Sequence, residues 1–257
     1  MPLLSVAKLS IHFGGLAALI NCSFDVEQGK IFSLIGPNGA GKTTVFNIIN
    51  GIYKADRGKI LFDGTDITHL APHNVARLGV ARTFQNIELF SKMTVLENVL
   101  VGQHIHLCSG ILSGGLLLGR VRAEEKLARE EANNIFDFLG LTDYRSHLVS
   151  DLPHGIQTRV EMARALAAKP KILLLDEPAG GLNPQETQVL MQLIERIRSD
   201  LKITVLLVEH DMAVVMGLSD RICVLHFGQK IAEGSPGEIQ KHPRVTEAYL
   251  GETVEHA

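Results

Sequence analysis

The octapeptide GPNGAGKT, residues 36–43, decides the fold of this 257-residue chain. It follows the apolar run IFSLI at 31–35 and precedes a segment that is expected to turn helical near Thr43. The pattern G-x-x-x-x-G-K-[ST] between a strand and a helix is typical of a phosphate-binding loop, because its curled backbone points N–H groups at an anion. Lys42 is expected to bridge the β- and γ-phosphates, and the Thr43 hydroxyl to bind Mg²⁺. The sequence therefore predicts a nucleoside-triphosphate-binding protein.

The whole loop is expected to contact the nucleotide. The alternative is a glycine-rich turn that contains Lys-Thr by chance, but glycine supplies only 24 of the 257 residues, and the flanking strand and helix favour the phosphate loop. The expected nucleotide-binding residues here are Gly36, Pro37, Asn38, Gly39, Ala40, Gly41, Lys42, Thr43 and Thr44.

Two further runs resemble 31–35 in being short, apolar and rich in branched side chains: ILLL at 172–175 and ITVLLV at 203–208. Such runs suit central strands of a parallel sheet that helices cover on both faces. The stretch at 4–13 alternates like a half-buried strand, and ILFD at 60–63 forms another short one, so these two predict an antiparallel edge. We predict an α/β fold of the P-loop NTPase kind, with a mostly parallel sheet flanked by helices.

Between about residues 87 and 160 the pattern becomes helical. Apolar residues recur at helical spacing over 122–139, and Gly140 ends that helix. We therefore predict one domain, with an α/β core at 1–86 and 161–257 and an inserted helical lobe at 87–160. Within the core, 221–234 predicts a hairpin with Gly228 and Gln229 at its turn, and the last residues predict a helix before a loose end.

Acidic and basic side chains follow the other two apolar runs. Asp176 ends LLLD and suits a carboxylate that holds Mg²⁺ through water, whereas Glu177 faces differently and is a candidate general base for the attacking water. The alternative is that both are solvated acids at a strand end. His210 follows ITVLLVE and either contacts the γ-phosphate or is structural. Because ligands bind at the carboxyl edge of such sheets, these side chains and the loop at 36–43 predict one composite site.

Composition excludes several classes of protein. The net charge is −3 and no run of Lys or Arg reaches five residues, so no nucleic-acid partner is expected. No apolar run approaches the about 18 residues needed to cross a bilayer.

Cysteine and histidine residues suggest no further site. The cysteines Cys22, Cys108 and Cys223 lie far apart in apolar settings, which predicts small core residues in a reducing compartment. The histidine pairs 69/73 and 104/106 are interpreted as solvated loop residues rather than metal ligands, because Pro72 interrupts any helix across the first pair and no Cys or carboxylate converges nearby.

The order of these motifs resembles the nucleotide-binding subunit of ABC transporters over nearly the whole chain. The resemblance implies ATP and Mg²⁺ as cofactors. It also implies that Gln85, in TFQNIELF, is the mobile glutamine that contacts Mg²⁺ and the γ-phosphate, and that Phe13 is the aromatic residue that stacks on adenine. An ordinary loop glutamine stays open for Gln85. Core packing stays open for Phe13, because Leu9 and Ile11 share its strand face.

The family's signature motif precedes the second acidic strand by about twenty residues and opens an amphipathic helix, as LPHGIQTRVEMARALAA at 152–168 does. By this resemblance His154, Gly155 and Gln157 contact the phosphates of an ATP held mainly by a partner chain. Pro153 stands where Ser is usual, so one hydroxyl contact is missing while the helix-terminal N–H groups remain. LSGGL at 112–116 matches the motif's letters but lies about sixty residues before Asp176 with no amphipathic continuation. We interpret it as a flexible apolar loop.

Several blocks narrow the resemblance to the larger ATPase subunit of branched-chain amino-acid importers. These blocks are FGGLAAL at 13–19, the Pro-x-Gly-x-Gln turn at 153–157, EPAGGLNPQET at 177–187, EHDM at 209–212 and AYLGE at 248–252. The resemblance implies a peripheral subunit on the cytoplasmic face of the cell membrane, docked under permease subunits. It implies head-to-tail pairing with a second ATPase subunit, with a homodimer possible in isolation, and no direct contact with the amino-acid substrate. Asn183, where Asp is usual, weakens the expected communication between the two ATP sites.

Two other functions stay open. A soluble ATPase of the same family that acts on DNA or ribosomes would bring two cassettes or a long coiled-coil insertion, and the chain has neither. A subunit that binds ATP but hardly hydrolyses it is suggested by Pro153 and Asn183, although Lys42, Asp176 and Glu177 are all present.

Overall fold

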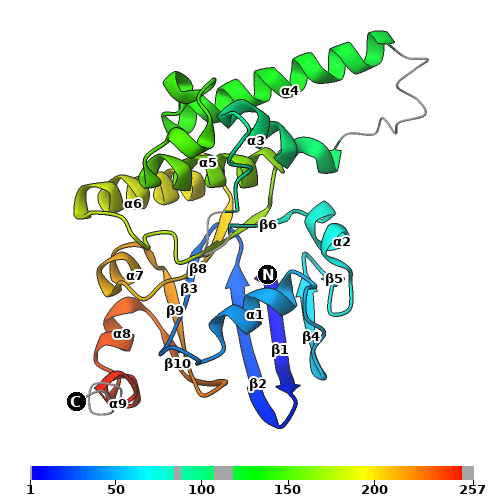
Figure 1. Cartoon of the computed structure of the whole chain (residues 1–257). Coiled ribbons are helices and arrows are strands. Elements are labelled where there is room, and N and C mark those ends of the chain that lie inside the picture. The colour runs from blue at the N-terminus through cyan, green and yellow to red at the C-terminus, as the bar shows by residue number, and fades with distance from the viewer. Residues whose placement is uncertain (1, 84–87, 107–117, 251–257) are drawn as a thin grey trace.

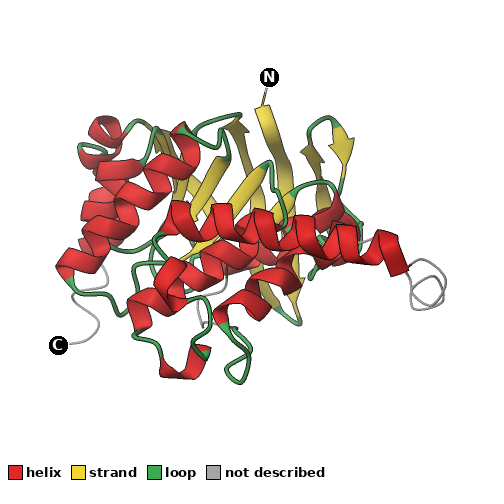
Figure 2. Ribbon diagram, turned by 90° about the horizontal axis from the view of Figure 1, so that it is seen from above, coloured by secondary structure: helices red, strands yellow, loops and turns green. Residues whose placement is uncertain are grey.

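The computed structural model describes residues 2–83, 88–106 and 118–250. Two β-sheets stand beneath a lobe of helices, and a view from above shows the long helices of that lobe lying over the strands (Figures 1 and 2). The strands are β1 Pro2–Phe13, β2 Leu16–Glu27, β3 Ile31–Ile35, β4 Arg57–Phe62, β5 Thr65–Asp66, β6 Val80–Arg82, β7 Ile172–Asp176, β8 Thr204–Val208, β9 Arg221–His226 and β10 Gln229–Gly234. The α-helices are α1 Lys42–Ile49, α2 Pro72–Arg77, α3 Val95–Gly102, α4 Leu118–Leu139, α5 His154–Ala167, α6 Pro184–Ser199, α7 Met212–Leu218, α8 Pro236–Gln240 and α9 Pro243–Leu250.

The larger sheet has six strands in the order β10-β9-β3-β8-β7-β6, and only the β9–β10 pair is antiparallel. The three apolar runs of the sequence become β3, β8 and β7, which are neighbours with every residue buried. β1 pairs antiparallel with β4 in a separate sheet of four strands, ordered β2-β1-β4-β5. The mostly parallel sheet and the antiparallel edge are thus confirmed. Strands β2 and β6 were not expected, because β2 is interrupted by polar residues and β6 is only three residues long.

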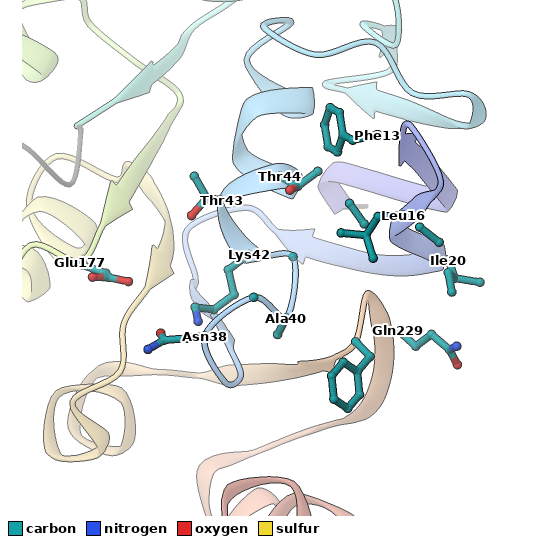
Figure 3. A pocket seen from close by; sticks show the side chains of 15 residues that line it. Phe13, Leu16, Ile20, Asn38, Ala40, Lys42, Thr43, Thr44, Glu177 and Gln229 are labelled. Atoms are coloured by element: carbon teal, nitrogen blue, oxygen red, sulfur yellow. The ribbon is translucent and has the colours of Figure 1, made fainter. Parts of the chain in front are cut away.

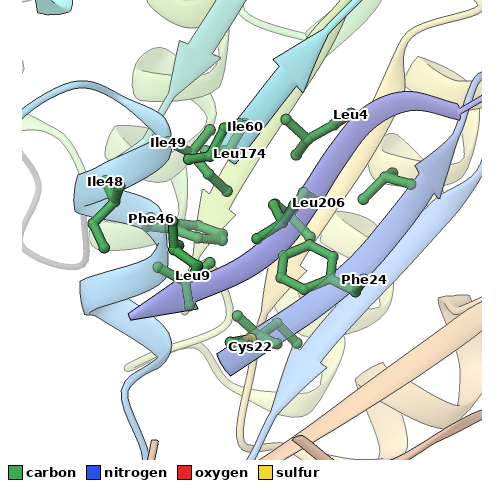
Figure 4. Close-up of a cluster of buried hydrophobic side chains, with 14 of the residues drawn as sticks. Leu4, Leu9, Cys22, Phe24, Phe46, Ile48, Ile49, Ile60, Leu174 and Leu206 are labelled. Atoms are coloured by element: carbon green, nitrogen blue, oxygen red, sulfur yellow. The ribbon is translucent and has the colours of Figure 1, made fainter. Parts of the chain in front are cut away.

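Alternate residues of the central strands pack into two different hydrophobic clusters. Leu174 and Leu206 face a cluster that fills the space between the two sheets and α1, where Phe46 and Ile49 pack (Figure 4). Their neighbours Leu173 and Leu207 face the opposite cluster, under the helices of the lobe. Burial on both faces explains why these strands read as continuous apolar runs.

The helical lobe contains α3, α4, α5 and short 3₁₀ turns at Gln103–His106, Thr142–Tyr144 and Val149–Asp151. The amphipathic helix expected over 122–139 is α4, which begins four residues earlier and stops before Gly140, whose φ is +65°. The helix expected over 152–168 is α5, with ten buried residues. Both expectations are confirmed. In the described ranges no helix is long and apolar enough to span a membrane.

The hairpin expected over 221–234 forms from β9 and β10, but its turn lies one residue earlier than expected, at Phe227 and Gly228. Their φ angles are +45° and +75°, the left-handed pair that a tight hairpin turn requires.

Two of the three cysteines can be placed. Cys22 and Cys223 are fully buried, as expected of small core residues, and burial raises the pKa of the Cys22 thiol to about 12. Cys108 lies outside the described residues.

Gly102 allows α3 and α5 to approach closely, because a Cβ built there would lie 2.1 Å from the backbone oxygen of Arg164. We predict that Gly102→Ala lowers the free energy of unfolding by about 1–3 kcal/mol through overpacking. Urea denaturation measures this, with Gly237→Ala as the control, since a Cβ at Gly237 meets no atom within 4 Å. Equal stability of the two variants would show that the contact between the helices is not tight.

Candidate functional site

The phosphate loop runs from the end of β3 to the start of α1 and lies against two other strands. A Cβ at Gly36 would lie 2.1 Å from the backbone oxygen of Leu225 in β9, and one at Gly41 would lie 2.8 Å from that of Ala18 in β2. Both glycines have positive φ, +149° and +103°. These two positions therefore require glycine both for backbone conformation and for space.

Lys42, the first residue of α1, is 6% exposed. Its ammonium donates hydrogen bonds to the backbone oxygens of Gly36 at 2.6 Å and Pro37 at 3.1 Å. The charge therefore lies inside the curve of the loop, next to the N-terminus of α1, where an anionic group is favoured.

A pocket of about 700 Å³ opens over the loop (Figure 3). Among the residues expected to bind nucleotide or act on it, those that line the pocket are Phe13, Asn38, Gly39, Ala40, Gly41, Lys42, Thr43, Thr44 and Glu177. Six lining residues were not foreseen, namely Leu16, Ala17, Ala18, Ile20, Phe227 and Gln229. They come from β2, from the β9–β10 turn and from the start of β10. In the sequence, the apolar FGGLAAL block and the hairpin predicted over 221–234 pointed to these segments but not to the pocket.

Phe13 lies at the end of β1 and is 44% exposed, whereas Leu9 and Ile11 are 0% and 3% exposed. The pairing of β1 with β2 shifts register between Ile11 and His12, so Phe13 no longer follows the buried stripe. Its ring meets that of Tyr53 edge-on, with centroids 5.1 Å apart. Core packing is therefore the wrong interpretation of Phe13, which instead offers an aromatic face at the pocket.

Asp176 ends β7 with a side chain that is 1% exposed. Its Oδ2 accepts a hydrogen bond of 2.6 Å from Arg82, which also donates to Asn47 in α1 at 2.6 Å. Asp176 is thus not a solvated acid, and Arg82 and Asn47 are partners that sequence reasoning missed. The short β6 that carries Arg82 has no strong pattern, and nothing local in the sequence pairs it with β7.

The residues near Asp176 fit a magnesium ion. The second oxygen, Oδ1, is buried and has no hydrogen-bond partner within the described ranges. A buried carboxylate oxygen is costly unless it has a partner, and Mg²⁺ is commonly held by one or two carboxylates together with substrate phosphates and water. The Thr43 hydroxyl, on the loop, is the other oxygen ligand expected for such an ion. Gln85, expected to complete the set, lies outside the described residues.

Glu177 follows Asp176 directly but leaves the strand. Its φ is +49°, a left-handed conformation that is uncommon for a residue with a side chain, and its N–H donates to the backbone oxygen of Val208. This turn places the carboxylate, 18% exposed, at the pocket. His210 Nδ1 lies 3.7 Å from Glu177 Oε2. The strand ends therefore bring together the acid and the histidine that the sequence separates by 33 positions.

The signature turn lies elsewhere. Pro153 occupies the N-cap position of α5 and provides no side-chain hydrogen bond, as its lack of a hydroxyl requires. His154, Gly155 and Gln157 do not line the pocket. The Gln157 amide donates to the backbone oxygens of Val149 and Leu152, so it stabilises the preceding turn.

A hydrogen bond ties this turn to the segment after Glu177. His154 Nε2 donates to the backbone oxygen of Gly180 at 3.0 Å. Asn183 caps α6, where its side-chain oxygen accepts from the N–H groups of Gln185 and Glu186, both at 3.0 Å. Asn183 thus has a structural role as the cap of α6. The LSGGL stretch at 112–116 lies outside the described residues.

Known proteins resemble the chain along almost its full length. The ABC transporter family pattern matches residues 19–180, and that of branched-chain amino acid ATP-binding cassette transporters matches residues 229–255. The high-affinity branched-chain amino acid transport ATP-binding protein BraF of Pseudomonas aeruginosa is 46% identical over 98% of both chains. LivG of Escherichia coli, which bears the same description, is 47% identical over 98% of both.

Solved structures of ATP-binding cassettes also match the chain along most of its length. An ATP-binding cassette of an ABC transporter in its ADP conformation matches with a TM-score of 0.86 and 33% identity, covering 98% of this chain and 99% of the other. A dimeric post-hydrolysis cassette bound to ADP and phosphate matches with a TM-score of 0.75 and 26% identity, covering 91% and 98%. The chain therefore belongs to the ABC transporter family, as one of its ATP-binding cassettes.

Proposed function

We propose that this chain is the ATP-hydrolysing subunit of an ABC importer for branched-chain, hydrophobic amino acids. The observation that carries the proposal is that one pocket is lined by the phosphate loop with its buried lysine, by the exposed face of Phe13 and by Glu177. The kind of cargo is suggested by relatives described as branched-chain amino acid transport proteins over 98% of this chain.

The site residues expected from the sequence take distinct roles in this proposal. The backbone N–H groups of residues 36–44, apart from Pro37, which has none, and the Lys42 ammonium hold the phosphates, while Phe13 stacks on adenine. Glu177 orients the attacking water or accepts its proton, and His210 donates a hydrogen bond to the γ-phosphate. Thr43, Asp176 and Gln85 hold Mg²⁺ directly or through water, and the ion when bound offsets negative charge on the phosphates.

A second ATPase subunit completes the site. The turn at 153–157 lies outside the pocket of its own chain, so its helix-terminal N–H groups are available to the ATP of a partner packed head-to-tail. We propose a heterodimer, with a homodimer possible in isolation, on the cytoplasmic face of the membrane beneath permease subunits. Those permeases, rather than this chain, contact the amino acid, and no nucleic acid is bound.

Transport follows from closure of this dimer. ATP touches both chains only in the closed state, so its binding favours closure by differential contact, and loss of the γ-phosphate removes that preference. We propose that the core at 1–86 and 161–257 and the helical lobe at 87–160 act as the two parts of one ATPase domain, with the lobe passing closure to the permeases.

Pro153 supports a second candidate, a subunit that binds ATP but scarcely hydrolyses it. It has no hydroxyl with which to bond the γ-phosphate, so one neutral hydrogen bond is missing, a loss of about 1 kcal/mol. Because that contact serves the ATP held mainly by the partner, the weakened site would be the partner's rather than the pocket that Glu177 lines.

Glu177→Gln is predicted to lower the steady-state rate of ATP hydrolysis at least about 100-fold, because the amide cannot accept a proton from water. ATP binding is expected to persist, so the closed dimer accumulates and is measurable by size-exclusion chromatography with ATP. The control is Glu130→Gln on the exposed face of α4, which should hydrolyse ATP normally. Near-normal turnover in Glu177→Gln would remove this residue from the proposed role.

Phe13→Trp is predicted to report nucleotide binding directly, because the chain contains no other tryptophan. Adenine stacked on the indole should quench its emission when ADP is added. Phe90→Trp is the control, since Phe90 is 50% exposed and lies outside the pocket. If ADP binds, as calorimetry can establish, and the Phe13→Trp emission stays constant, adenine does not stack there.

The rate of ATP hydrolysis against protein concentration separates the pairing modes. A self-pairing chain should show specific activity that rises with concentration, because each site needs two copies. A chain that requires its heterologous partner should stay inactive alone and gain turnover when that partner is added. Activity independent of concentration and of any partner would contradict a shared site.

A further inference from the structure

The carboxylate of Glu209 is buried and bonds to two separate loops. It follows β8 directly, and its side chain is 0% exposed. Oε1 accepts a hydrogen bond of 2.8 Å from the N–H of Ala179, in the segment after β7. Oε2 accepts from the N–H groups of His210 at 3.0 Å and Asp211 at 3.3 Å, at the approach to α7. One buried side chain thus joins the segment that carries Glu177 to the one that carries His210.

Burying a carboxylate costs free energy, because the charged group loses its hydration. A buried carboxylate needs partners, and here, within the described residues, its hydrogen bonds come from backbone N–H groups rather than from a cationic side chain. Burial raises the pKa of the Glu209 carboxyl, although the three N–H donors act in the opposite direction. The ring nitrogen His210 Nδ1 lies 4.0 Å from Oε2.

The contact to Ala179 supports an unusual stretch of backbone. Glu177 has φ +49°, and the Gly180 N–H closes a turn onto the Glu177 oxygen at 3.0 Å. The Ala179 N–H held by Glu209 lies within that turn. Fixing it constrains the direction in which Glu177 leaves β7, and therefore its 3.7 Å separation from His210.

The same turn leads to the signature helix. Gly180, the residue after Ala179, accepts the hydrogen bond from His154 at the first turn of α5. The line of contacts therefore runs from Glu209 through Ala179 and Gly180 to His154, which faces the other ATP site in the proposed dimer.

We propose that Glu209 is a positioning residue for ATP hydrolysis, which holds Glu177 and His210 at their working separation by bonding the backbone of both loops. The proposal rests on the function proposed above for Glu177 and His210. Glu209 itself is buried and does not line the pocket, and its hydrogen bonds go to Ala179, His210 and Asp211 rather than to the phosphate loop. Its loss should therefore lower the rate of the chemical step while nucleotide still binds.

Glu209→Gln tests this with almost no change in volume. The amide keeps one acceptor oxygen, but its NH₂ group must face an N–H donor, so one of the two loops is released. A displacement of about 1 Å of reacting groups can lower a rate about 100-fold, and we expect kcat to fall at least about tenfold. KM for ATP and the Kd for ADP should stay within about threefold of the wild type. The aspartate side chain of Glu209→Asp is too short to reach both loops, so this variant should show the same loss of kcat as Glu209→Gln.

The matched control is Glu233→Gln, since Glu233 is a partly buried carboxylate on β10 that is bonded to Arg221 and Lys230, outside the pocket. It should retain wild-type kcat. The kinetics of all variants are measured in the assembly in which the wild type hydrolyses ATP, either the chain alone or the chain with its partner subunit. A Glu209→Gln enzyme with kcat within twofold of wild type overturns the proposal, as does one in which kcat and ADP affinity fall together.

Amide hydrogen exchange tests the contact independently of turnover. The N–H groups of Ala179, His210 and Asp211 should exchange faster in Glu209→Gln than in the wild type, while those of α1 should not change. Unchanged exchange at all three overturns the proposal. If the wild type proves unable to hydrolyse ATP in any assembly, the proposed function fails by itself, and the exchange measurement still decides whether Glu209 holds the loops.

Discussion

The close approach of backbone to backbone around residues 36–41 is the constraint on which the rest of the structure depends. Gly36 lies against β9 and Gly41 against β2, in both cases at distances that no side chain permits. The Gly228 N–H also donates to the Ala40 oxygen, and the Ile20 N–H donates to the Gly228 oxygen, so the loop is held from outside by both sheets. A loop supported in this way keeps its N–H groups oriented before any anion arrives, which reduces the entropy lost on binding.

Two buried carboxylates fix neighbouring segments in the same way. Asp176 bonds to Arg82, and through it to Asn47 in the helix that follows the loop. Glu209 bonds backbone N–H groups from two loops. Neither arrangement contributes much to stability, because the hydrogen bonds to a buried charge do little more than offset the free energy lost when the charge leaves water. Both restrict the positions of neighbouring groups, which is what a site for phosphoryl transfer requires.

The first turn of α5 keeps its helical hydrogen bonds although it has no side-chain cap. Proline at the N-cap removes a hydroxyl, yet Ile156 and Gln157 donate normally to the Pro153 oxygen and the helix begins at His154. The N-terminal end of the helix therefore keeps its partial positive charge. The histidine bond to Gly180 and the packing of Gly155 against Glu186 hold this turn on the segment after β7.

The sequence by itself determined the local features: the phosphate loop, the three central strands, the helix that follows Pro153 and the identity of Glu177 and His210 as candidates. Each is a short pattern whose physical cause, such as glycine backbone freedom or two-sided burial, acts within a few residues. Only the tertiary structure decided that Phe13 leaves the core, that β2 and the Phe227 turn complete the pocket, and that Arg82 and Glu209 hold the acids and loops. The contact between Arg82 and Asp176 depends on the pairing of β6 with β7, strands that lie more than 90 positions apart in the sequence. The exposure of Phe13 depends on a register shift in β1. Such pairing is set by the packing of the whole core, and no single stretch of sequence records it.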